Sequence, residues 1–441
     1  MMRLVIVTPS AAFAQSAGAR VRYQPMAAAV EDSVTLCPLD ALTFEADAYL
    51  FSKTYQAEAP ATAHRLASAG KRVALDVFDD YFTDGRDARL ERFRRWFKEM
   101  AALVGAISVS TPHLAARLEA VYGVAPTVVP DPHPLVSAEG LVRTLRGRTM
   151  DPDALHLAWF GIASNPYHPA GLADLAAFAD RLGGAGAHRL TILTNGEGAD
   201  PAALSALGAC PIDVEWHTWS PEAEADLLAR CDAAVLPVNG QPFSAAKSLN
   251  RALTALCSGA QVLSLGHPLY EALDRYIYRD LRELVADARE GTPRLRLSTA
   301  TPFVEDLNAR YSPRRCAEAV LAMVRGIEPP TPRPRAIVLG ACDGSALSLA
   351  DALTLATPLW QGAAADFHLG TDGEVSDKAA AMLDDGQRER LASGEEGPQL
   401  AGHGVLDQAR ARAILAAGEA AAREALPDHT VFTAHEGTLA P

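Results

Sequence analysis

The sequence predicts an α/β protein with two doubly wound domains in tandem and a C-terminal appendix of different composition. Short apolar runs alternate with amphipathic helical stretches, and the runs lack the polar alternation of a half-exposed strand. This pattern is typical of a parallel sheet covered by helices on both faces. The periodicity fades between residues 134 and 153, and a proline-rich segment follows the second set of runs. We therefore expect domains at 1–135 and 150–327, a stiff linker at 328–335 and an appendix at 336–441.

The first domain is expected to contain five strands. The predicted strands are 4–7, 48–51, 73–77, 106–109 and 127–129, and the predicted helices are 61–69, 86–101 and 113–121. The first fifteen residues also imitate a signal peptide, but the apolar run 4–7 is too short for one. A buried first strand is the better interpretation.

The second domain repeats the pattern. Its predicted strands are 155–160, 190–193, 214–216, 233–238 and 261–265, and its predicted helices are 171–182, 221–231, 245–257 and 312–325. Thr111, Ser220 and Ser312 each stand directly before a proline. A hydroxyl followed by a first-turn proline favours a capped helix start.

Charge and cysteine usage exclude several classes of protein. The net charge of the 441 residues is −14, and the appendix alone carries 16 acidic and 6 basic residues. Non-specific nucleic-acid binding is therefore excluded as the main function. The six cysteines form no CxxC pair, which favours a reducing compartment and argues against a structural metal site. No apolar run reaches the length of a membrane helix, so we expect a cytoplasmic protein. Within the appendix, 336–340 resembles a strand and 406–426 a helix.

Polar residues follow two strands of the first domain, where ligands bind in doubly wound sheets. Arg20 and Arg22 stand before a predicted helix and could grip a phosphate or an acceptor sugar; a solvated helix start is the alternative. Asp79 and Asp80 follow the strand 73–77, beside Asp76. Carboxylates there suit a general base, sugar hydroxyls or a divalent cation, although a capped turn would also explain them.

Two loops of the second domain carry candidates for phosphate binding. Gly161 ends an apolar strand and allows close approach of a ligand, while Ser164 and Asn165 can donate to phosphate oxygens. Lys247 is expected in the first turn of a helix capped by Ser244, where a cation opposes the helix dipole unless an anion is bound. The neighbouring candidates are Ser248, Asn250 and Arg251.

In several segments the chain resembles the GT-B glycosyltransferases of the group 1, or family 4-like, superfamily. Trp159-Phe160-Gly161 is similar to the opening of their nucleotide-binding domain, and Lys247–Arg251 to their donor-site helix. The other matching segments are 107–114, 127–131, 214–216, 221–237, 259–263 and 312–325. The resemblance covers residues 3–327 and implies two Rossmann-like domains that face a cleft. Many retaining members carry two glutamates eight positions apart, where this chain has Ala246 and Thr254.

The resemblance implies transfer of a sugar from a nucleotide-sugar donor to a glycan or lipid-linked acceptor in bacterial cell-surface polysaccharide synthesis. It implies no required metal and no further cofactor. Peripheral association with the inner face of the membrane is a further expectation. In the retaining mechanism Lys247 would stabilise the departing diphosphate, whereas an inverting mechanism would need Asp79 or Asp80 as the base.

Two alternative functions stay open. The two missing glutamates favour an inactive GT-B protein that binds nucleotide-sugars or serves as a partner of another protein. A nucleotide-sugar epimerase would have the same fold, but no convergent set of acids and a histidine is evident. Trp216, His217 and Trp219 are candidates for contact with the base, with core packing as the alternative for the tryptophans.

Overall fold

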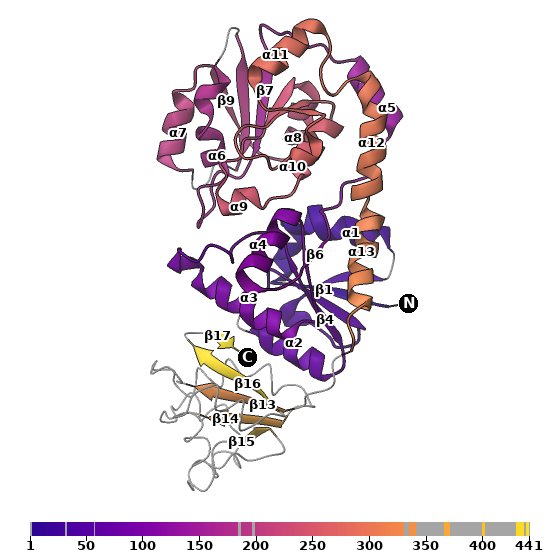
Figure 1. The fold of residues 1–441 in the computed structure, drawn as a ribbon, viewed down its shortest axis with the longest axis vertical. Coiled ribbons are helices and arrows are strands. Elements are labelled where there is room, and N and C mark those ends of the chain that lie inside the picture. Colours follow the sequence, from indigo (N-terminus) through magenta and orange to yellow (C-terminus); the bar gives the residue numbers. More distant parts are fainter. Residues whose placement is uncertain are drawn as a thin grey trace.

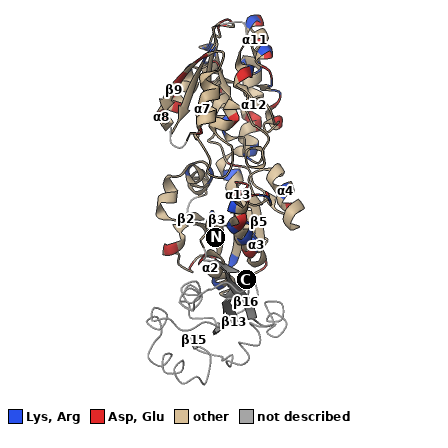
Figure 2. Ribbon diagram, turned by 90° about the vertical axis from the view of Figure 1, so that its left-hand side faces the viewer, with Lys and Arg blue, Asp and Glu red and all other residues tan. Residues whose placement is uncertain are grey.

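The computed structural model describes residues 2–30, 33–56, 58–183, 187–195 and 199–329, together with the backbone of five strands between residues 335 and 440. Two α/β lobes are stacked along the long axis of the molecule, with a smaller third sheet beyond the first lobe (Figure 1). A quarter turn about that axis shows the same stacking of the two α/β lobes (Figure 2). We call the first sheet and the helices packed on it the first lobe, and the second sheet with its helices the second lobe.

The first lobe contains a six-stranded, all-parallel sheet in the order β2-β1-β3-β4-β5-β6. Its strands are β1 (Leu4–Thr8), β2 (Val34–Pro38), β3 (Ala48–Ser52), β4 (Arg72–Val77), β5 (Ala106–Val109) and β6 (Thr127–Val128). A π-helical turn (Ala19–Tyr23) leads into α1 (Gln24–Ala29), and three further helices are α2 (Glu58–Ser68), α3 (Glu91–Leu103) and α4 (Pro112–Tyr122). All five predicted strands are confirmed. The edge strand β2 was not predicted, because only its first residue is buried and its sequence has no apolar run.

The second lobe contains another all-parallel sheet, in the order β12-β11-β10-β7-β8-β9. Its strands are β7 (His156–Gly161), β8 (Arg189–Thr194), β9 (Asp213–Thr218), β10 (Ala233–Val235), β11 (Gln261–Leu263) and β12 (Ile277–Tyr278). Its helices are α6 (Leu172–Ala176), α7 (Pro201–Gly208), α8 (Pro221–Arg230), α9 (Pro242–Ala245), α10 (Asn250–Cys257) and α11 (Leu281–Glu290). The predicted doubly wound architecture of both lobes is thereby confirmed.

Two consecutive helices, α12 (Leu297–Tyr311) and α13 (Pro313–Arg325), run along one side of both lobes (Figure 1). Helix α13 packs against the first sheet, where Val320, Leu321 and Val324 join the core formed by Leu4 and Ile6. The region of faded periodicity contains α5 (Ala138–Arg146), which lies against α12. The chain therefore returns to the first lobe after it has formed the second.

The helix starts of the sequence prediction are partly confirmed. The side chain of Thr111 accepts a hydrogen bond from the amide of Leu114, and that of Ser220 accepts one from the amide of Ala223. Ser312 precedes α13 but makes no such capping bond. The predicted helix 171–182 is divided into α6 and a 3₁₀ turn at Ala179–Leu182.

The third sheet has the order β15-β14-β13-β16-β17, with parallel pairs inside and antiparallel pairs at both edges. Its strands are β13 (Arg335–Gly340), β14 (Asp366–Gly370), β15 (Gln399–Ala401), β16 (His429–His435) and β17 (Thr438–Ala440). The strand expected at 336–340 is confirmed as β13. The helix expected at 406–426, Cys342 and most of the linker lie outside the described residues. The domain boundaries stay a prediction.

Candidate active site

A cavity of about 450 Å³ lies between the two lobes. Its walls come from the loops that follow β1, β3 and β4 in the first sheet and β7 and β10 in the second. The strand order reverses beside β1 in the first sheet and between β7 and β10 in the second. Both reversals open a crevice at the carboxyl ends of parallel strands, which is where such sheets bind ligands. The two crevices face the same cavity.

An ion-pair cluster occupies the first-lobe side of this cavity. Asp79, which follows β4, binds the ammonium of Lys53 at 2.5 Å through Oδ2 and that of Lys247 through Oδ1. Lys53 follows β3 in the first lobe, whereas Lys247 belongs to the second lobe. The carboxylate of Asp79 is 7% exposed, and the two lysine side chains are 26% and 39% exposed. One buried carboxylate therefore joins cations from both lobes.

Burial by itself would raise the pKa of Asp79. The ammonium groups of Lys247 and Lys53 outweigh it and bring the pKa to about 2. A general base works best when its pKa lies near the operating pH. While both lysines are in place, Asp79 is therefore a permanently charged counter-ion and a weak base.

Lys53 is the residue of this cluster that the sequence analysis missed. Its backbone has φ of +54°, the one positive φ among the described non-glycine residues. Its ammonium also lies 4.3 Å from the centre of the Phe78 ring, within cation–π range. The available signal was its place directly after the buried strand β3, because the carboxyl ends of all strands of this sheet meet at one edge.

The prediction for the helix around Lys247 is wrong. Lys247 lies between α9 and α10, three residues before α10 begins, and Gln241 rather than Ser244 caps α9. The hydroxyl of Thr111 in the first lobe donates to the carbonyl of Ala246 at 3.1 Å, so that this carbonyl is already bonded where a continuous helix would use it. Lys247 still lines the cavity, and its ammonium lies 3.9 Å from the centre of the Phe243 ring.

A buried network anchors the floor of the cavity. The guanidinium of Arg22 donates to both oxygens of Asp76 at 2.7 Å, to Asp131 at 2.6 Å and to the carbonyl of Val129 at 3.0 Å. Asp131 also accepts a bond of 2.7 Å from the amide of Asn250 at the start of α10. Burial opposes the charge of Arg22, but Asp76 and Asp131 raise its pKa well above the usual value. The network thus connects the two lobes beside the ion-pair cluster.

Two predicted site residues have other partners. Arg22 is 1% exposed and fully engaged by the network, so it supports the floor rather than offering free donors to an acceptor. Asp80 was expected to face the cleft together with Asp79. Instead it accepts bonds from the amides of Phe82 and Thr83 and from Arg117 at 2.9 Å, and it does not line the cavity. The turn that begins with Asp79 points successive side chains in opposite directions.

Arg20 reaches the second lobe. Its guanidinium lies 5.5 Å from the centre of the Trp219 ring, and the indole of Trp219 donates to Glu224 at 2.6 Å. Trp219, Trp216 and His217 do not line the cavity, and Trp216 is 42% exposed on the edge strand β9. Arg20 therefore lies at the border between the lobes.

The second-lobe wall contains several of the predicted residues. Gly161 lines the cavity, and a Cβ there would meet the Arg251 guanidinium at 3.0 Å and the Trp159 ring at 3.1 Å. Arg251 donates to the carbonyl of Phe160 at 3.0 Å. Asp174 was not predicted; it accepts bonds from the amide of Asn239 and the hydroxyl of Ser244, each at 2.9 Å, and burial raises its pKa.

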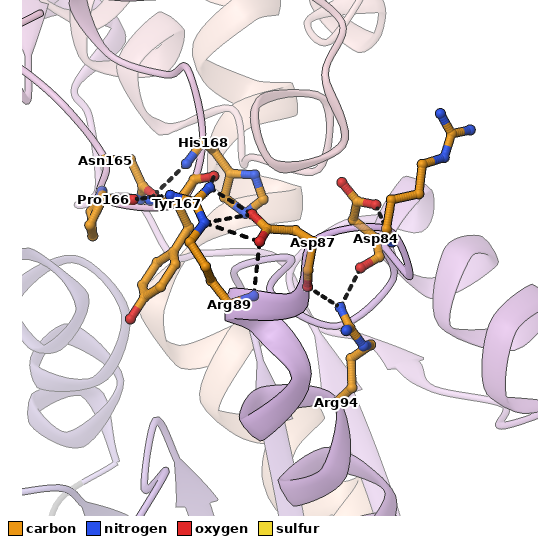
Figure 3. A network of polar contacts seen from close by, with 9 residues as sticks. Asp84, Asp87, Arg89, Arg94, Asn165, Pro166, Tyr167 and His168 are labelled. Carbon is orange, nitrogen blue, oxygen red and sulfur yellow. Dashed lines mark hydrogen bonds and ion pairs between the residues drawn. The ribbon is translucent and has the colours of Figure 1, made fainter.

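The loop that carries Asn165 is held from both lobes (Figure 3). Asn165 accepts bonds from the amides of Tyr167 and His168. Its own amide donates to the hydroxyl of Tyr81 at 3.1 Å. Arg89 of the first lobe donates to the carbonyls of Pro166 and Tyr167. Asn165 lines the cavity, whereas Ser164 does not. The side chain of Asn165 is thus mainly part of the turn.

A second cavity, of about 690 Å³, adjoins the first, and Lys247 lines both. Ser248 and Asn250 line both cavities. Among the parts of the chain that the structure describes, no three His, Cys, Asp or Glu side chains come together as metal ligands do. No helix among the same residues is long and apolar enough to span a membrane.

The two parallel sheets, the cavity between them and the returning helix define the class: this is the GT-B fold of glycosyltransferases, as the sequence resemblance predicted. In particular, the trehalose-6-phosphate synthase OtsA matches with a TM-score of 0.50 and 11% identity, over 74% of this chain and 100% of that one. This likeness shows the fold.

Two other solved structures match with lower scores. An α-glucosyltransferase in complex with UDP and a 13-mer DNA has a TM-score of 0.45 and 12% identity, over 74% of this chain and 99% of that one. Anabaena Alr3699/HepE in complex with UDP has a TM-score of 0.45 and 11% identity, over 74% of this chain and 100% of that one. The sequence matches no protein-family model and no curated protein.

Proposed function

We propose that the protein is a glycosyltransferase that moves a sugar from a nucleotide-sugar to an acceptor bound between the lobes. The observation that carries this proposal is the placement of Lys247 and Arg251 at the cavity, beside the crevice of the second sheet. The second lobe would hold the nucleotide, and the first lobe, near Arg20 and Asp79, would hold a glycan or lipid-linked acceptor. The pathway is proposed to be the assembly of a cell-surface polysaccharide.

The proposed chemistry is electrostatic. When the bond between the sugar and the diphosphate breaks, negative charge develops on the leaving oxygen. Preorganised cations in a site shielded from water stabilise that charge without reorganisation, and each such contact contributes roughly 10²–10³ in rate. Lys247, whose side chain is 39% exposed and lines the cavity, supplies the cation, and Gly161 places no side chain between the end of β7 and the ligand. The chemistry needs neither a metal ion nor another cofactor.

The acid–base properties of Asp79 favour this route over direct base catalysis. With a pKa of about 2, the carboxylate would remove a proton from a sugar hydroxyl only weakly. Asp79 fits better as the residue that holds Lys247 in place until the substrate arrives.

The test is a panel of UDP-, GDP- and ADP-sugars, with release of nucleoside diphosphate as the signal, for the parent and for Lys247→Ala. Lys98→Ala is the matched control, because Lys98 is exposed on α3, away from the cavity. We expect slow release from one donor, faster release with added acceptor, and a drop of roughly 10²-fold in the Lys247 variant alone.

The alternatives give different results in the same experiment. An epimerase would give a new nucleotide-sugar without releasing the diphosphate. A binding protein would be stabilised by a nucleotide-sugar without turnover. Equal release from parent and Lys247→Ala would show that the cation has no part in the reaction.

A further inference from the structure

The ion-pair cluster contains two ammonium groups and only one carboxylate. Asp79 is a single carboxylate, yet it binds Lys53 through one oxygen and Lys247 through the other. The three groups together carry a net charge of +1, and both lysine side chains are partly open to the cavity. Two ammonium groups that share one carboxylate at the wall of a concave site attract an anionic ligand.

The backbone of Lys53 is in a costly conformation. A left-handed φ of +54° at a residue with a side chain is sterically unfavourable, and glycine would avoid the cost. Strain of this kind persists where the surroundings hold it and is concentrated at functional sites. Here it directs the ammonium of Lys53 over the Phe78 ring and onto Asp79, at the wall of the cavity.

The wall beside Lys53 is closely packed. Gly18 and Phe78 line the same cavity as Lys53, and a Cβ on Gly18 would come within 3.0 Å of the Phe78 ring, so the ring that carries the Lys53 ammonium is held in place. Lys53 belongs to the first lobe and Lys247 to the second. An anion between their ammonium groups would therefore be bound by both lobes at once.

We propose that Lys53 is a phosphate-binding residue, the first-lobe counterpart of Lys247. In the free protein Asp79 bridges the two lysines and neutralises one of their two charges, and a phosphate group of the substrate binds both ammonium groups from the cavity and compensates the other. This inference rests on the proposed function for the location of the site. The phosphate belongs either to the donor's diphosphate or to a phosphorylated acceptor, and the test separates these two sources.

The experiment compares Lys53→Met, Lys53→Arg and Lys53→Gly with the parent, and Lys98→Met is the control at an exposed lysine. Calorimetry measures the affinities for UDP, uridine and glucose 6-phosphate at low and at high salt. Loss of one charge-assisted hydrogen bond weakens phosphate binding by roughly 10- to 100-fold. Lys53→Met should show this loss, Lys53→Arg should recover most of the affinity, and uridine should bind all variants equally.

The glycine variant separates charge from backbone strain. Lys53→Gly loses the ammonium but relieves the left-handed φ, so its thermal unfolding midpoint should exceed that of Lys53→Met. Its phosphate affinity should fall to the same level as in Lys53→Met. A residue that only held the fold together would not show this separation.

The outcomes are distinct for the two proposals. Weaker UDP binding in Lys53→Met assigns the phosphate to the donor, and weaker glucose 6-phosphate binding with unchanged UDP affinity assigns it to the acceptor. If the parent binds UDP and Lys53→Met binds both ligands equally well, the inference fails and the proposed function stands. If the parent binds glucose 6-phosphate through Lys53 but no nucleoside diphosphate, the inference stands and the proposed function fails.

Discussion

Replacing Asp79 by Asn tests the ion-pair cluster directly. The carboxylate is 7% exposed and has a pKa of about 2, against an ordinary value of 3.8. Each unit of pKa difference corresponds to about 1.4 kcal/mol. The charged form of Asp79 therefore contributes roughly 2 kcal/mol to the free energy of unfolding at pH 7, and Asp79→Asn should lose a similar amount.

The dependence on pH has a definite sign. Because the pKa of Asp79 is lower in the folded state, its contribution is complete above pH 4 and is lost as the pH falls toward 2. At pH 3 about half of it should remain. Urea unfolding at pH 7, 5 and 3 measures the difference between parent and variant.

A control and an anion sharpen this experiment. Asp153→Asn removes an exposed ion pair with Arg289 and should cost less than about 0.5 kcal/mol at every pH. Added pyrophosphate should recover part of the stability lost in Asp79→Asn, because it supplies a counter-ion for both lysines. A difference that does not change between pH 7 and pH 3 would refute the reasoning.

Three further predictions concern buried positions of the two lobes. Asp131→Ala should lower the free energy of unfolding by roughly 3–5 kcal/mol, because it breaks a buried network around Arg22; urea unfolding measures this, and a loss below 1 kcal/mol would contradict it. Gly171→Ala should lower the thermal midpoint by several degrees, because φ is +79° and the new Cβ would lie 2.3 Å from the carbonyl oxygen of Ile162. Burial raises the pKa of Glu99 to about 8, so the parent should lose stability as the pH rises from 4.5 to 8. Glu99→Gln should remove that loss and be the more stable protein at pH 8, and unfolding curves at pH 5 and 8 that shift in parallel would argue against it.

The two-sheet architecture was predictable because each central strand has a local sequence signal. The central strands of both sheets are continuous apolar runs, such as Val73–Leu75 within β4, and such runs are typical of strands that are buried on both faces of a sheet. Strand β2 was missed because only the first of its five residues is buried, and β12 because it has only two residues. Lys247 and Asp79 were placed at the cavity for the same local reason: each follows a buried strand.

The pairings within the site could not be predicted from local patterns. Asp79 and Lys247 are 168 residues apart and lie on different lobes. The hydrogen bond from Thr111 to Ala246, which fixes the gap between α9 and α10, spans 135 residues. An aspartate that caps a turn and one that lines a site have the same local sequence. Asp80 caps the turn and binds Arg117, whereas Asp79 binds the two lysines at the cavity, and only these contacts distinguish them.

Helix α13 has a consequence for the synthesis of the protein. The first sheet is complete at residue 128, but part of its core is covered by Cys316, Val320 and Val324. The ribosome must add about 200 further residues before that cover exists, which takes roughly 10–40 s at 5–20 residues per second. Each new chain therefore carries an unfinished apolar surface on its first lobe while the second lobe is being translated. In that interval we expect chaperones that shield apolar surface to bind the first lobe, until α13 leaves the ribosome and covers the sheet.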